Sequence, residues 1–215
     1  NPAHYGMEYE KSKWAFEDSI ASWTWGGYEG KPIIVEIFSA SDEVELFVNG
    51  RSLGRKPAGE EQQFTVKYET VYEPGELMVK AFYKKSEEDE ALQTDYVETL
   101  ITAEEKVELY AEADRTQLTA NGADISFITV ELRDKNGIVN VQEQKNITIE
   151  VEGCVCIQGY GNADPFFVGN YQQRTIPSFE GRVQAVVRAG FETGKAKVKF
   201  TAEGCEAVEV DLTVK

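Results

Sequence analysis

The sequence predicts an all-β protein built from two consecutive immunoglobulin-like β-sandwiches, preceded by a short irregular linker. Short apolar runs with a period of two recur along the chain, turn dipeptides separate them, and no amphipathic helix of about ten or more residues is present. The clearest run places Val44, Leu46 and Val48 on one face of a strand. Asn49-Gly50 follows it and supplies the two positive-φ residues that a type I′ hairpin turn needs.

The first sandwich is expected over residues 21–103. Residues 33–38 are rich in β-branched side chains, and Phe64, Val66 and Tyr68 alternate with polar neighbours. Pro74-Gly75 marks a turn, and the charged stretch 84–90 predicts a loop. The expected strands are 33–38, 44–48, 52–55, 64–68, 77–83 and 94–101.

The second sandwich is expected over residues 104–215. Charge clusters at residues 103–106, and the alternating pattern restarts directly after them. A long strand over 125–133 ends at the turn Asp134-Lys135-Asn136-Gly137. The expected strands are 107–111, 125–133, 147–151, 154–157, 183–188, 195–201 and 207–214.

Residues 1–20 differ from both sandwiches. Four aromatic residues, Tyr5, Tyr9, Trp14 and Phe16, lie among charged and small residues without a clear period. We interpret this stretch as an extended linker that packs its aromatic side chains on the first sandwich or on a neighbouring domain. The chain begins at Asn1 without an initiator methionine, so we expect a fragment of a longer protein.

The charge balance argues against two classes of partner. The chain has 22 Lys and Arg residues against 38 Asp and Glu residues, a formal net charge of −16. Such a surface repels phosphate backbones and anionic lipids, so we expect neither nucleic acid nor a membrane surface as a partner. No apolar run approaches the roughly 18–20 residues that span a bilayer, and no signal peptide is recognisable.

The residues needed for common catalytic and metal sites are missing. His4 is the only histidine, and it lies in the expected linker. Cys154, Cys156 and Cys205 lack the spacing of a zinc site, and an odd count is no disulfide framework. We expect free, buried thiols, with a cross-strand pair to Cys205 as the alternative. We expect no metal, no cofactor and no complete active site in this chain.

Two aromatic groups are candidates for contact with a carbohydrate or with a catalytic barrel. In the first, Trp23, Trp25 and Tyr28 precede the first strand, where their rings either stack on a sugar face or close the end of the sandwich core. The favoured interpretation is the core. The second group lies in a loop where two turn-forming polar residues stand between aromatic ones. The two polar side chains either point outward or brace the loop as Asx-turns. Its candidate residues are Tyr160, Asn162, Asp164, Phe166 and Phe167, with Tyr171 nearby.

The two halves resemble known modules in order. Residues 23–32, Trp-Thr-Trp-Gly-Gly-Tyr-Glu-Gly-Lys-Pro, and 44–54 resemble the domain that follows the catalytic barrel in bacterial glycoside hydrolase family 2 enzymes of the β-galactosidase type. The second half, with Leu118 to Phe127 and the run Gly161-Asn162-Ala163-Asp164-Pro165, is similar to their terminal domain. Residues 120–137 are also similar to the immunoglobulin-like repeats of invasin-type adhesins.

The resemblance implies a parent enzyme that hydrolyses β-galactosides or related β-glycosides with retention, in the bacterial periplasm or after secretion. Its two catalytic glutamates lie on the barrel, and no position here matches either of them. We therefore expect a non-catalytic region whose partner is the catalytic domain of the same chain. A stand-alone carbohydrate-binding module is the alternative, and an adhesin-type surface spacer is a third. Exposure of the aromatic rings distinguishes the first two.

Overall fold

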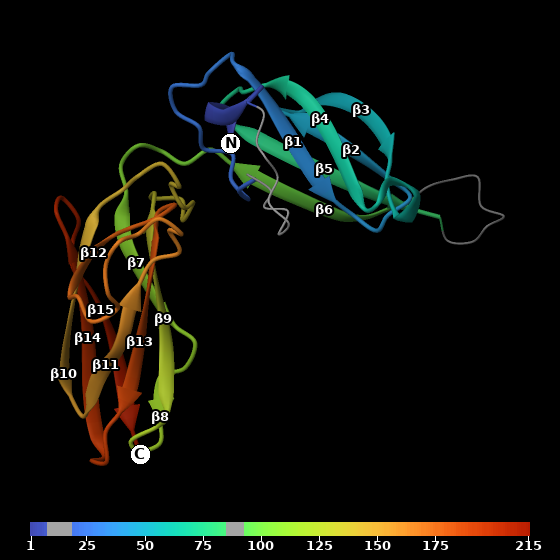
Figure 1. The fold of residues 1–215 in the computed structure, drawn as a ribbon. Helices are drawn as coiled ribbons and strands as arrows, with labels where there is room; N and C mark the ends of the chain where they lie inside the picture. Colours follow the sequence, from blue (N-terminus) through green and yellow to red (C-terminus); the bar gives the residue numbers. More distant parts are fainter. Residues whose placement is uncertain (8–18, 85–92) are drawn as a thin grey trace. The chain divides into compact units, whose positions relative to one another are not determined.

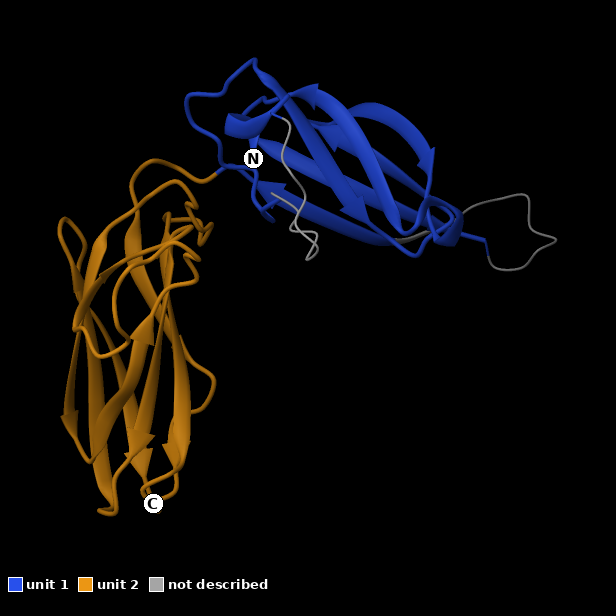
Figure 2. Ribbon diagram, in the orientation of Figure 1, with its two compact units in different colours: residues 1–102 blue, residues 103–215 orange. Residues whose placement is uncertain are grey.

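The computed structural model describes residues 1–7, 19–84 and 93–215 of the chain. It divides into two compact units, residues 1–102 and 103–215 (Figures 1 and 2). Both are built from β-strands, and the described helical turns are two short 3₁₀ segments, Pro2–His4 and Glu60–Gln62. The chain is therefore all-β, as the sequence predicts. None of the helices in the part that the structure describes is long and apolar enough to cross a membrane.

The first unit contains two antiparallel sheets of unequal width. Strands β1 and β4 form a two-stranded sheet, and a four-stranded sheet has the order β3-β2-β5-β6. The Asn49-Gly50 turn joins β2 to β3 with φ of 49° and 77°, as the type I′ prediction requires. The bounds are β1 Pro32–Phe38, β2 Glu43–Val48, β3 Arg51–Pro57, β4 Thr65–Val71, β5 Glu76–Tyr83 and β6 Gln93–Ile101.

The core of the first unit follows the period-2 pattern of its strands. Val44, Leu46 and Val48 are buried along β2, while the residues between them are partly exposed. Tyr68 on β4 donates its hydroxyl to the carbonyl oxygens of Val44 (2.9 Å) and Gly54 (3.0 Å), which joins the two sheets. Burial is the largest cause that raises the pKa of Tyr68 to about 12, and the nearby Glu45 carboxylate adds to it.

The second unit is a sandwich of a five-stranded sheet, β12-β10-β14-β15-β8, and a four-stranded sheet, β11-β13-β9-β7. Its pairs are antiparallel except β15 with β8, which is parallel. The bounds are β7 Glu108–Ala113, β8 Gln117–Leu118, β9 Ile125–Arg133, β10 Asn146–Gly153, β11 Val155–Gly161, β12 Thr175–Pro177, β13 Arg182–Ala189, β14 Gly194–Ala202 and β15 Val208–Val214.

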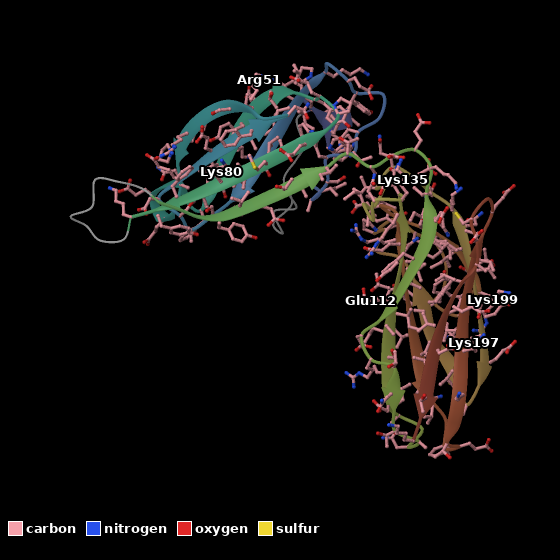
Figure 3. The ribbon with its side chains drawn as sticks, turned by 180° about the vertical axis from the view of Figure 1, so that it is seen from behind. Arg51, Lys80, Glu112, Lys135, Lys197 and Lys199 are labelled. Atoms are coloured by element: carbon pink, nitrogen blue, oxygen red, sulfur yellow. The ribbon has the colours of Figure 1, made fainter. Side chains whose placement is uncertain are left out.

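Alternation along β14 shows how this core is built. Ala196, Val198 and Phe200 are buried between the sheets, whereas Lys197 and Lys199 point away from them (Figure 3). Lys197 forms a 2.6 Å ion pair with Glu209 on the neighbouring strand β15. Apolar faces of both sheets therefore form one core, and charged residues cover the outside.

The observed elements differ from the expected ones in a few places. Strands β8 and β12 were not predicted, because two- and three-residue edge strands are too short to show a period. Several strands are longer than expected; β3 extends to Pro57. The three cysteines are free, but Cys156 is exposed, so the expectation of a buried thiol is wrong there. Trp14, Phe16 and Tyr9 of the expected linker lie outside the described residues, as does most of the expected 84–90 loop.

Candidate functional site

The first group of predicted contact residues lies largely inside the first unit. Trp23 and Trp25 are 1% and 6% exposed and belong to its core. The Trp23 ring meets Tyr72 edge to face, at 5.1 Å between ring centroids, and its indole N–H donates to the carbonyl oxygen of Glu73 (2.9 Å). Neither Trp presents a flat face to solvent.

Hydrogen bonds fix the segment that carries these rings. The Thr102 hydroxyl donates to the carbonyl oxygen of Trp23 (2.6 Å), and the Trp25 amide donates to the Tyr72 hydroxyl (3.2 Å). Tyr28 is half-buried, with the Lys31 ammonium 4.7 Å from its ring centroid. The segment before β1 is thus bound to the ends of β4 and β6, and of the three aromatic residues Tyr28 has the most open ring.

The second group divides into a buried anchor and a braced loop. Tyr160 is 1% exposed, packs near Phe200 and donates its hydroxyl to the carbonyl oxygen of Ile147 (3.1 Å). Burial raises the pKa of Tyr160. The Asn162 amide donates to the carbonyl oxygen of Pro177 (2.8 Å), while its side-chain oxygen accepts from the Asp164 amide (3.2 Å).

The same bracing continues toward the tip of the loop, where the side chains become exposed. The Asp164 carboxylate accepts from the Phe166 amide (2.9 Å), an Asx-turn. Phe167 is half-buried against the core, whereas Phe166 is 88% exposed. Val168 and Tyr171 are exposed as well. In this predicted group, the rings of Phe166 and of the nearby Tyr171 therefore lie open to solvent, and the contact role of the whole set stays a prediction.

Glu131 is a buried carboxylate on β9 that the sequence pattern did not indicate. It accepts from the Arg182 guanidinium (2.8 Å) and from Arg133 (2.7 Å), whose own guanidinium lies 3.6 Å from the Tyr110 ring centroid. Burial raises the pKa of Glu131, but the hydrogen bonds from the two arginines outweigh it and hold the pKa below its usual value. Glu131 is therefore a stabilising anion rather than a proton donor.

Asp134 has a similar role in the turn after β9. Its carboxylate accepts from the backbone amides of Glu104 (2.9 Å), Asn136 (2.8 Å) and Ile138 (2.9 Å). Burial acts to raise its pKa, and these amides together lower it. The acid predicted as part of a turn thus fixes the start of the second unit against the end of β9.

The carboxylates with a perturbed pKa are unsuited to acid catalysis. Within the described residues, each Asp or Glu whose pKa departs from its ordinary value has it lowered: Asp114, Asp124, Glu131, Asp134 and Glu209. A glycosidase general acid needs a raised pKa so that it is protonated before the bond breaks. No group of three or more potential metal ligands occurs in the same described ranges. The acids with a lowered pKa stabilise the fold through the hydrogen bonds that they accept.

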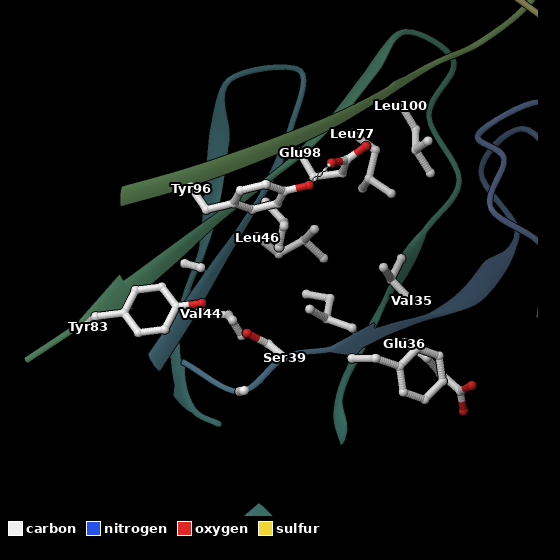
Figure 4. A pocket seen from close by; sticks show the side chains of 15 residues that line it. Val35, Glu36, Ser39, Val44, Leu46, Leu77, Tyr83, Tyr96, Glu98 and Leu100 are labelled. Atoms are coloured by element: carbon white, nitrogen blue, oxygen red, sulfur yellow. Dashed lines mark hydrogen bonds between the residues drawn. The ribbon is translucent and has the colours of Figure 1, made fainter. Parts of the chain in front are cut away.

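A groove of about 460 Å³ lies between the edge strands β1 and β6 of the first unit (Figure 4). Its floor is apolar and includes Val35, Leu46 and Leu100. Tyr83, Tyr96 and Glu98 lie at its side, and the Tyr96 hydroxyl donates to the Glu98 carboxylate (2.5 Å). The periodicity of the sequence did not predict this groove, because apolar residues occupy both faces of β6: Tyr96 and Leu100 on one face, Val97 and Ile101 on the other.

Comparison with known proteins assigns the two units. Residues 109–211 match the family described as glycoside hydrolase family 2 C-terminal domain 5, and residues 30–88 match a domain of unknown function, DUF4982. Beta-galactosidase BoGH2A from Bacteroides ovatus is 31% identical over 167 residues, which are 78% of this chain and 19% of that protein. The two units are C-terminal accessory domains of the glycoside hydrolase family 2 type.

Solved structures agree with this assignment. A glycosyl hydrolase family 2 member from Bacteroides cellulosilyticus superimposes with a TM-score of 0.86 at 30% identity, covering 96% of this chain and 26% of that one. A beta-glycosidase from Bacteroides vulgatus gives a TM-score of 0.80 at 25% identity, covering 91% and 24%. The accessory domains thus span about a fifth to a quarter of the length of these glycoside hydrolase family 2 relatives. The β-sandwich fold of the two units is the fold that the sequence predicts.

Proposed function

We propose that this chain is the non-catalytic C-terminal region of a retaining, β-galactosidase-like glycoside hydrolase, and that it supports the catalytic domain structurally. The observation that carries the proposal is the match of nearly the whole chain to a small part of much longer glycosidases. Each unit has its own buried core. Two stable sandwiches can brace a neighbouring domain or form the rim of its active site without taking part in the chemistry.

The contact surface we propose for this role is the loop around Phe166. An 88% exposed aromatic ring on a loop held by Asn162 and Asp164 suits a contact with a second domain, because the loop is ordered before it binds. The same geometry offers little to a sugar, since Trp23, Trp25 and Tyr160 are buried. Three of the rings that the carbohydrate-binding alternative requires to be exposed are therefore buried.

The test compares the longer enzyme with and without this region. We expect the isolated chain to leave a chromogenic β-galactoside intact, and the catalytic domain without it to unfold at a lower temperature. Phe166→Ser in the longer enzyme should lower its unfolding temperature, while Phe191→Ser, at a ring on another loop that is also largely exposed, serves as the control. Turnover of the substrate by the isolated chain, or an unchanged catalytic domain after deletion, would contradict the proposal.

A further inference from the structure

Strand β1 has one edge without a partner in the described structure. It pairs with β4 alone, and the pairing runs without interruption from Pro32 to Phe38. Beyond its two ends, the Tyr72 amide donates to the Lys31 carbonyl oxygen (2.9 Å) and the Ser39 amide donates to the Phe64 carbonyl oxygen (2.9 Å). Hydrogen-bonded pairs alternate along antiparallel strands, so odd-numbered residues of β1 face β4. The amides of Ile34, Glu36 and Phe38 therefore point to the free edge.

The apolar floor beside this edge is only partly covered. Ile33, Val35 and Ile37 share the inward face of β1, yet Ile33 is buried whereas Val35 and Ile37 are half-exposed. On the opposite sheet, Val79 and Leu100 are also half-exposed and line the groove. A two-stranded sheet covers a four-stranded one incompletely, and the uncovered part is the groove between β1 and β6.

Within residues 96–101 of β6, Glu98 is the charged residue on the inward face. Glu98 pairs across the sheet with Val79, between the pairs Leu77–Leu100 and Ala81–Tyr96, so it faces the groove. It accepts the Tyr96 hydroxyl and has no ion pair within the described ranges. A strand that covered Glu98 would have to bring a cation to this level, because burying an unpaired carboxylate costs free energy.

We propose that the β1 edge and this groove receive an extended strand from the catalytic domain of the same enzyme. The strand carries apolar side chains at alternate positions and a lysine or arginine opposite Glu98. Its backbone pairs with Ile34, Glu36 and Phe38, and its apolar side chains cover Val35, Ile37 and Leu100, which is β-strand addition. The inference rests on the proposed function, which supplies a donor on the same polypeptide at high effective concentration.

Hydrogen exchange tests the pairing directly. Deuterium uptake of peptides covering residues 32–38 is compared between the longer enzyme and the isolated 215-residue chain. We expect the three amides of Ile34, Glu36 and Phe38 to exchange at least tenfold more slowly in the longer enzyme, and those of Ile33, Val35 and Ile37 to be protected in both. Equal exchange in the two proteins would overturn the inference, whether fast in both or slow in both.

Two further results separate the other occupants. Slow exchange that appears in the isolated chain only at high protein concentration would indicate a second copy of this chain and would overturn the inference. Glu98→Lys in the longer enzyme should speed exchange of the same three amides, because it repels the incoming cation. Glu76→Lys, an exposed residue at the start of the neighbouring strand β5, is the matched control and should change nothing.

The result also separates this inference from the function it rests on. If deletion of the region lowers the unfolding temperature of the catalytic domain while the β1 amides stay unprotected, the supporting function stands and the strand addition falls. If neither effect is found, both fall.

Discussion

Trp23 and Tyr72 meet edge to face at 5.1 Å between ring centroids, and this pair fixes the segment before β1 to the end of β4. The Tyr72 hydroxyl also contacts the backbone of both Trp23 and Trp25. One aromatic pair therefore connects residues about fifty positions apart in the sequence. The backbone that leads into β1 is therefore held in place directly before the strand begins.

Removing the larger ring of this pair should destabilise the first unit. Trp23→Ala leaves a cavity against Tyr72 and the Glu73 carbonyl without a donor, so we expect a loss of about 3–5 kcal/mol. Urea unfolding followed by amide signals of β2 and β4 measures it. Phe191→Ala, at a ring that is 80% exposed in the second unit, should change stability by less than about 0.5 kcal/mol. A loss at Trp23 of the size found at Phe191 would contradict the core role.

Stability at low pH should depend on Glu131. Its folded pKa is lowered by Arg182 and Arg133, so its contribution is present above the unfolded pKa of about 4.3 and is lost as the pH falls through the folded pKa. Glu131→Gln should remove this part of the acid sensitivity of the second unit and weaken it at pH 7 by about 1–3 kcal/mol. Thermal unfolding between pH 7 and 3 measures both. Equal pH profiles for the two proteins would refute the assignment.

Stability at high pH should depend on Tyr68. Its folded pKa is raised to about 12, so its contribution is complete below the unfolded pKa of about 10 and is lost as the pH rises through the folded value. Tyr68→Phe should therefore be less stable than the natural chain at pH 8, with a smaller difference at pH 12. Absorbance of tyrosinate near 295 nm should show one late-titrating residue fewer in the variant.

Two glycines with positive φ should respond differently to alanine. A Cβ at Gly153 (φ 88°) would lie 2.3 Å from the Lys195 carbonyl oxygen, whereas a Cβ at Gly137 (φ 82°) meets nothing within 4 Å. Gly137→Ala carries backbone strain alone, about 1 kcal/mol, and Gly153→Ala adds displacement of β14. We expect Gly153→Ala to cost at least about 1 kcal/mol more in chemical unfolding. Equal losses of stability in the two variants would show that β14 shifts away from the added Cβ without a cost in free energy.

The sequence predicts the fold well wherever one strand face is buried. Strand β9 was predicted with its observed bounds, because Ile128, Val130 and Leu132 alternate with less buried neighbours over a long run. Strands β8 and β12 were not predicted, because they are short and lie at the edges of their sheet. Edge strands need few apolar residues, so their pattern is weak.

The candidate sites were harder to predict, because exposure depends on tertiary contacts. Trp23 and Phe166 each lie in a Gly-rich stretch, yet one ring is 1% and the other 88% exposed. What separates them is a partner from elsewhere in the chain: Tyr72 covers Trp23, whereas no comparable ring contact is described for Phe166. The groove beside β1 likewise arises from the unequal widths of two sheets, which local periodicity does not encode.

The parallel pairing of β8 with β15 has a consequence for synthesis of the protein. Gln117 and Leu118 find their partners at Thr213 and Val214, and β15 also lies between β14 and β8 in the five-stranded sheet. The second unit therefore cannot close this sheet until residues 208–214 have left the ribosome, whereas the first unit is complete roughly a hundred residues earlier. During translation, the first sandwich should therefore fold while the second is still incomplete and attached to the ribosome.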